Sequence, residues 1–258
     1  MLHYTDRVRQ DPLIRTVDPA AMGLQLLRRA PEKVADHPLW VEAQARMKDR
    51  LGYIRQPEGP VLEHGISQFG QAVRPASDQV ATIWSVGLLA YLSDPRSTLG
   101  FWAKILQPGG LLMFSTLGPD TLRPLALALE DAANLRHVPG YPDMHDLGDA
   151  LLSLSMANPV MDVERLTLTY TRPEAALEDI RQLGGNPLLG RPKGLCGRSW
   201  QKRVLLALES LRSSGVISLP IELVFGHAWA ATPASDSADG LKTVRWVGKQ
   251  PKNAASGI

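Results

Sequence analysis

The sequence predicts an α/β protein with a largely parallel sheet. Segments with a strand pattern alternate with segments of helical periodicity along residues 39–230, which is typical of this fold class. The strand-like segments are short and mostly apolar, as expected for strands that are covered on both faces. Proline and glycine clusters at 56–60 and 107–110 separate them, and such clusters mark turns.

Each element has its own local signal. Apolar residues three and four apart predict a helix over residues 39–54, and the prolines that follow end it. Runs that are apolar or alternate in polarity predict the strands 61–63, 80–89, 111–116, 165–170 and 221–230, with an additional edge strand at 244–247. Helical periodicity or a capping residue predicts the helices 94–106, 121–134, 146–155, 173–183 and 200–213.

Composition narrows the class of protein. The chain has 258 residues, of which 44% are hydrophobic and 21% charged, and a formal net charge of +2. This is an ordinary globular composition that argues against nucleic acid or a membrane as a partner. The single cysteine, Cys196, forms no intramolecular disulfide, and we expect a cytoplasmic protein. We predict an N-terminal arm over 1–38, one domain over 39–230, and a tail over 231–258.

Six segments carry a resemblance to a known family. They are 50–63 (RLGYIRQPEGPVLE), 94–125, 143–170, 176–188 (ALEDIRQLGGNPL), 194–198 (GLCGR) and 219–230 (LPIELVFGHAWA). In this order they resemble the class I S-adenosylmethionine (SAM) methyltransferases, and most closely the malonyl-acyl-carrier-protein O-methyltransferases of biotin synthesis. The resemblance implies a Rossmann-like sheet with additional C-terminal helices, and SAM as cofactor without a metal. It also implies methylation of the free carboxylate of malonyl-carrier protein.

The turn after the first strand departs from the family pattern. It reads EHGISQFG over residues 63–70, so only Gly65 matches the family's glycine-rich run. Only the fourteen residues 66–79 separate this turn from the next strand, and one parallel crossover takes about a dozen residues. We therefore predict that the family's strands 2 and 3 are missing, which leaves the order 1-4-5-7-6. Glu63, Gly65 and Asp78 remain as the candidates for holding SAM.

Other positions on the cofactor side also differ from the family. Its N-terminal Tyr and Gln, which close over the cofactor, align with Lys33 and Trp40, and the Asn that it carries after a Trp-Ser pair aligns with Val86. The loss of two strands would also leave the strand at 61–65 as a sheet edge with unpaired backbone groups. We expect residues 1–40 or a second subunit to cover that edge.

Two polar positions are candidates for the substrate side. Arg123 could hold a malonyl carboxylate by a bidentate bond, or it could be a solvated helix residue. His145 and Asp146 could form a catalytic pair, or Asp146 could cap a helix while His145 bonds locally. The sequence leaves both alternatives open, and the catalytic residues stay unassigned.

A cationic segment could bind a protein partner. Residues 191–203 contain five cations and no acid, namely Arg191, Lys193, Arg198, Lys202 and Arg203. Such a run is either a solvated face or a docking patch for an acidic carrier protein.

The sequence thus predicts a methyltransferase-like protein with an impaired SAM site, which binds a carrier protein or completes its sheet edge on an intact homologue. The alternative is an active SAM-dependent O-methyltransferase that acts on malonyl-carrier protein.

Overall fold

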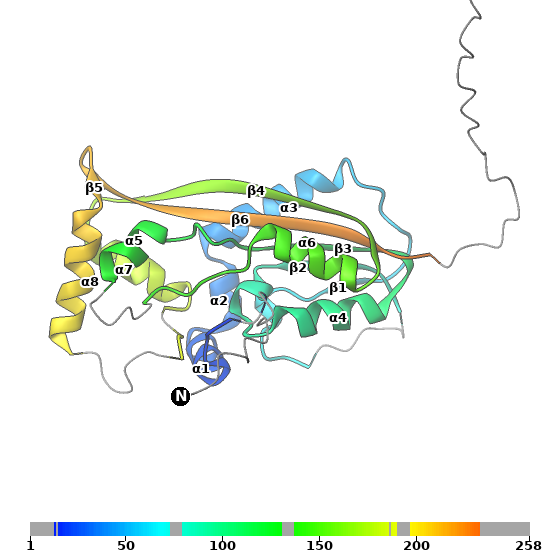
Figure 1. Cartoon of the computed structure of the whole chain (residues 1–258), viewed down its shortest axis with the longest axis horizontal. Helices are drawn as coiled ribbons and strands as arrows, with labels where there is room; N and C mark the ends of the chain where they lie inside the picture. Colours follow the sequence, from blue (N-terminus) through cyan, green and yellow to red (C-terminus); the bar gives the residue numbers. More distant parts are fainter. Residues whose placement is uncertain are drawn as a thin grey trace, which may run out of the picture.

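A computed structural model gives the fold of the chain (Figure 1). It describes residue 13 and residues 15–72, 79–130, 137–185, 187–189 and 197–232. Its sheet contains β1 (Val61–Glu63), β2 (Val80–Val86), β3 (Leu106–Leu117), β4 (Met156–Tyr170), β5 (Arg212–Ser213) and β6 (Val216–Ala230). Within this described part, the order β1-β2-β3-β6-β4 confirms the predicted order 1-4-5-7-6.

The sheet is largely parallel, as expected, because β6 alone among the described strands runs against the others. The strands β1, β2 and β3 are parallel, but β6 runs antiparallel to both β3 and β4. The reason is the β5–β6 hairpin. Ser214 and Gly215, both with positive φ, turn the chain so that β6 enters the sheet beside the carboxyl end of β4.

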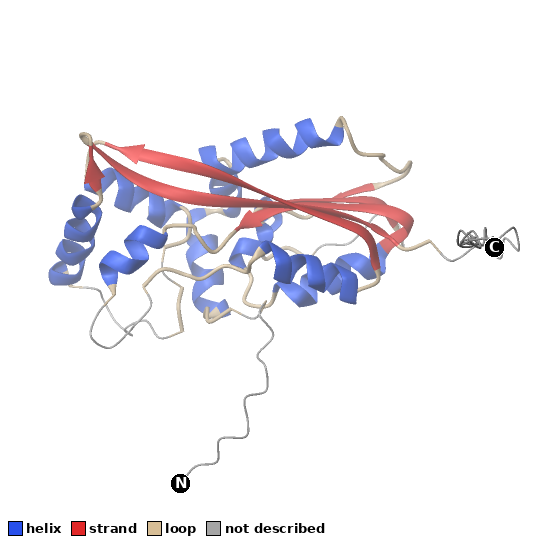
Figure 2. Cartoon of the chain, turned by 45° about the horizontal axis from the view of Figure 1, so that its top comes forward, coloured by secondary structure: helices blue, strands red, loops and turns tan. Residues whose placement is uncertain are grey.

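Helices cover both faces of the sheet (Figure 2). They are α1 (Pro19–Arg29), α2 (Pro31–Ala35), α3 (Pro38–Leu51), α4 (Pro95–Ile105), α5 (Arg123–Leu129), α6 (Met144–Ser153), α7 (Pro173–Gln182) and α8 (Arg198–Ser210), with the short 3-10 turns η1 (Ile66–Gln68) and η2 (Leu88–Tyr91). One hydrophobic cluster joins α4 and α6 to one face of the sheet, and another joins α3 to the opposite face. The helices α5, α7 and α8 lie together beside the carboxyl ends of β3 and β4 (Figure 1).

Several element limits differ from the expected ones. The strand expected over 80–89 ends at Val86, because Gly87 adopts φ +74° and turns the chain into η2. The strand expected over 165–170 begins at Met156, since a bulge lets it pass Asn158 and Pro159. The predicted edge strand 244–247 lies outside the described residues.

The segment before α3 packs on the domain. Met22, Leu26 and Val34 belong to the same hydrophobic cluster as Trp40. The buried Arg15 donates to the carbonyls of residues 90, 92 and 140, and burial lowers the pKa of its guanidinium. The domain limit at residue 38 stays a prediction. No helix in the described part of the chain is long and apolar enough to cross a bilayer.

In the described part of the chain, no strand pairs with the outer side of the edge strand β1. Val61 is 63% exposed, and none of the described residues of the arm pairs with it. Instead α2 packs on η1, beyond the end of the strand. Cover by a second subunit therefore stays a prediction.

Candidate functional site

The turn after β1 is closed by the chain itself. Gly65 donates its N–H to Oε1 of Gln68 at 2.8 Å, and a Cβ at Gly65 would lie 3.0 Å from the carbonyl oxygen of Val86. The glycine thus permits close contact between the carboxyl ends of the adjacent strands β1 and β2. Ile66 is 1% exposed and belongs to the core. Glu63 lies exposed at the sheet edge, and Asp78 lies outside the described residues.

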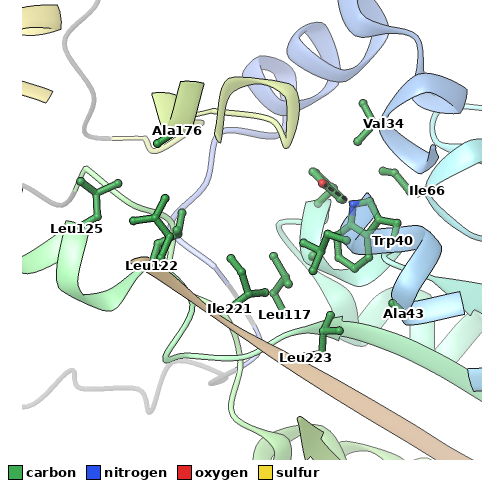
Figure 3. Close-up of a cluster of buried hydrophobic side chains, with 14 of the residues drawn as sticks. Val34, Trp40, Ala43, Ile66, Leu117, Leu122, Leu125, Ala176, Ile221 and Leu223 are labelled. Carbon is green, nitrogen blue, oxygen red and sulfur yellow. Dashed lines mark hydrogen bonds between the residues drawn. The ribbon is translucent and has the colours of Figure 1, made fainter. Parts of the chain in front are cut away.

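Aromatic side chains fill the space at the carboxyl end of β2. A Cβ at Gly87 would lie 2.9 Å from the ring of Trp40, which is fully buried. The indole Nε1 of Trp40, labelled in Figure 3, donates to the Tyr91 hydroxyl at 3.1 Å, and the two rings meet edge to face. Burial raises the pKa of the Tyr91 hydroxyl. Trp40 therefore occupies the end of this strand as a core residue.

These observations test whether the described residues fit SAM. A nucleoside cofactor on such a sheet needs a turn that its backbone can approach and a carboxylate for the ribose hydroxyls. Here the turn contacts β2 directly, and Glu63, the carboxylate at the end of β1, lies on an edge strand. The described residues do not fit the cofactor.

Beside this filled region, an apolar cavity lies at the carboxyl ends of the neighbouring strands. Its volume is about 280 Å³, and it lies between the carboxyl ends of β3 and β4, the start of β6, and the helices α5, α7 and α8. Its apolar wall includes Leu117, Leu122, Leu125, Leu129, Val138, Leu168, Leu177, Ile180, Leu183, Val204, Leu219 and Ile221. Figure 3 shows Leu117, Leu122, Leu125 and Ile221 within the surrounding cluster.

A polar cluster borders this cavity. The Asp179 carboxylate accepts hydrogen bonds from Nε2 of His37, at 2.9 Å, and from the Tyr170 hydroxyl. Nδ1 of His37 accepts the N–H of Leu39 at 3.2 Å, which assigns the ring proton to Nε2. Burial, together with the bond to Asp179, raises the pKa of Tyr170. The sequence offered no signal for this cluster, because His37 and Asp179 are 142 residues apart.

The two substrate-side candidates lie at separate helix starts and bond locally. Arg123 pairs with Asp120 at 3.0 Å and its side chain is 68% exposed. His145 bonds Asp143 at 2.5 Å through Nδ1, and the backbone N–H of His145 lowers the pKa of that carboxyl. The helix cap is Asp143, so the expectation that Asp146 caps it is wrong.

The cations of α8 differ in their surroundings. Arg198 and Lys202 are exposed. Arg203 donates to the carbonyls of Leu129, at 2.8 Å, and Glu130, and it stacks on Trp200. It therefore joins α8 to the end of α5. The other two cations of the proposed docking patch, Arg191 and Lys193, lie outside the described residues, as does Cys196. In the described ranges, no group of three or more His, Cys, Asp and Glu side chains is placed to hold a metal ion.

Comparison with known proteins decides the family. The chain is 42% identical over 174 residues to the malonyl-[acyl-carrier protein] O-methyltransferase of Laribacter hongkongensis, covering 66% of this chain and 59% of that protein. It is 33% identical over 203 residues to the protein of that name from Halorhodospira halophila, covering 78% of this chain and 67% of the relative. The chain belongs to the malonyl-acyl-carrier-protein O-methyltransferase family.

This chain spans about three fifths of the length of the first curated members of the family that it matches. No protein-family model matches it. Among solved structures it is similar to YcgJ from Bacillus subtilis, with 12% identity, a TM-score of 0.41, and coverage of 63% of this chain and 68% of that one. It is also similar to a putative methyltransferase from Bacillus halodurans, with 12% identity, a TM-score of 0.40, and coverage of 60% and 71%.

Proposed function

We propose that this chain is a member of the methyltransferase family that binds an acyl carrier protein without transferring a methyl group. One observation carries the proposal. The carboxyl end of β2 is filled by Trp40 against Gly87 and Tyr91, while a cavity remains open at the carboxyl ends of β3 and β4, beside an exposed cationic helix.

The filled end argues against methyl transfer on physical grounds. Transfer requires the methyl donor and the acceptor oxygen to be held about 3–3.5 Å apart in an aligned geometry. A cofactor at this place would have to displace a fully buried indole. Removing a buried tryptophan side chain from a protein core costs about 3–5 kcal/mol of folding stability. The free energy of cofactor binding would have to offset a cost of this kind.

The distal half supports carrier-protein binding. The family relatives are named for acting on malonyl-[acyl-carrier protein], and carrier proteins present acidic helices. On α8, Arg198 and Lys202 are exposed, where they could steer an acidic partner toward the cavity. We include Arg191 and Lys193 in the same docking patch. Arg203, bonded to the end of α5, holds α8 in position.

Calorimetric titration with SAM and with its demethylated product tests the first half of the proposal. The relative from Laribacter hongkongensis serves as the positive control. We expect no binding at micromolar concentrations by this chain. A micromolar Kd for SAM would overturn the proposal in favour of the active SAM-dependent malonyl-carrier-protein methyltransferase, the alternative that the names of the relatives favour.

Binding of a carrier protein tests the second half. We expect the double variant Arg198→Glu, Lys202→Glu to weaken binding of the malonyl-loaded carrier protein at least tenfold at low salt. Lys48→Glu on α3 is the control, because it reverses an exposed cation on another helix. Equal affinities of the double variant and the unmodified chain would exclude the docking patch.

An intact methyltransferase homologue is the second candidate partner, which the open outer side of β1 favours. Size-exclusion chromatography of the chain mixed with such a homologue would then show a complex that persists without any carrier protein. Separate elution of the two proteins would exclude it.

A further inference from the structure

We propose that the cavity enclosed by α5, α7 and α8 binds a saturated acyl chain of about eight to ten carbons. This inference rests on the proposed function in one respect, namely that a carrier protein supplies the acyl chain. The pocket itself is argued from its own residues.

The volume of the cavity sets the length of the ligand. A group of the size of a water molecule or a methylene takes about 30 Å³ in a liquid. The volume of about 280 Å³ therefore holds roughly nine such groups. A three-carbon malonyl group would leave most of this space empty.

The wall of the cavity sets the chemistry of the ligand. Leucine, isoleucine and valine side chains supply most of it, from strands and helices alike. Two of the polar groups that border it are bonded to protein: Thr121 exchanges hydrogen bonds with the backbone of Glu222, and the Tyr170 hydroxyl bonds the Asp179 carboxylate. An alkyl chain needs no hydrogen-bond partner, so it can lie against this wall without breaking these bonds.

The same wall disfavours a dicarboxylic group. Arg181 is the cation among the described residues that line the cavity. Its Nη1 lies 3.9 Å from Oε2 of Glu178, and its side chain is 45% exposed. Arg181 therefore lies at the rim of the cavity. A free carboxylate that enters the cavity deeply would be desolvated without a partner, at a large cost. The pocket therefore favours a chain that ends in a methyl group.

One helix connects this pocket with the proposed docking patch. Trp200 and Val204 of α8 line the cavity, while Arg198 and Lys202 of the same helix are exposed. A carrier protein held by the cations would thus present its acyl group beside the wall that accepts it.

The first test is a calorimetric titration of the unmodified chain with sodium salts of unbranched fatty acids from four to fourteen carbons, and with malonate. Each methylene that enters an apolar site tightens Kd about fourfold. We expect Kd to fall by more than a hundredfold between four and ten carbons, and then to stop falling. A Kd that does not depend on chain length, or malonate binding as tight as decanoate binding, would overturn the proposal.

The second test fills the cavity. Val204→Phe on α8 and Leu125→Phe on α5 each add a ring to the wall, and we expect each to weaken decanoate binding at least tenfold. Leu206→Phe, on the exposed side of α8, is the matched control and should bind as the unmodified chain does. A cooperative thermal unfolding transition shows whether each of the two variants is folded. If a folded variant binds decanoate as tightly as the unmodified chain, the proposal is overturned.

The two proposals fail in different ways. If the carrier protein binds equally well with and without a decanoyl group, and decanoate itself does not bind, the acyl pocket is excluded while the carrier function stands. If decanoate binds with the expected length dependence but no carrier protein binds, the pocket stands and the carrier function is excluded.

Discussion

Replacing Trp40 with alanine tests whether this side chain is part of the core at the end of β2. The indole is fully buried, contacts Gly87 and donates to the Tyr91 hydroxyl. Loss of a buried tryptophan costs about 3–5 kcal/mol, and the Tyr91 hydroxyl also loses its donor. We expect the free energy of unfolding to fall by about 4 kcal/mol, a large part of the roughly 5–15 kcal/mol typical of a folded domain.

Urea unfolding followed by circular dichroism measures this loss. With a slope of about 3 kcal/mol per M, the midpoint should fall by about 1.3 M. Val41→Ala is the matched control, because Val41 is the next residue on α3 and is 53% exposed. It should change stability by no more than about 0.5 kcal/mol. A loss of less than 1 kcal/mol in Trp40→Ala would refute the conclusion that the indole fills this part of the structure.

Three further predictions concern pH, packing and charge. Burial and its hydrogen bond raise the pKa of Tyr170, so above pH 10 the unfolded chain loses this proton first and stability falls. In Tyr170→Phe, the free energy of unfolding should fall less steeply between pH 10 and 11 than in the unmodified chain. The difference should stay below about 1.4 kcal/mol per pH unit, because the residue is only half-buried. Urea unfolding at each pH measures it. Gly226→Ala places a Cβ against the ring of Phe114 and should cost about 2 kcal/mol. Gly23→Ala, with open space inside α1, should gain about 0.5–1 kcal/mol, and the reverse order of stabilities in urea would contradict the packing. Arg203→Ala should cost about 1 kcal/mol through its lost carbonyl bonds, and Lys202→Ala about zero; equal midpoints in urea would show that Arg203 does not hold α8.

The sheet order could be predicted from the sequence, because the segments that resemble the family follow one another in a fixed order. The short connection over residues 66–79 then implied which strands are missing. The limits of the strands could not be predicted as well. In β4, Asn158 and Pro159 form a turn-like pair that only a bulge against β6 makes compatible with a strand.

The candidate site could be predicted only in part. The alignment placed Trp40 on the cofactor side, but its contact with Gly87 brings together residues from α3 and the end of β2. The bond between His37 and Asp179 joins residues far apart in the chain, and no local pattern indicates such a contact. The cavity also depends on three helices whose arrangement follows from tertiary packing.

The shortness of β1 has a consequence for self-association. An unpaired sheet edge can nucleate aggregation by adding strands from other molecules. Here that edge is only three residues long, and Pro57 and Pro60 precede it without backbone N–H groups to donate. An incoming strand would gain few main-chain hydrogen bonds at this place. A stable partner on this side must therefore bind mainly through side chains, which favours a specific complex over fibrous assembly.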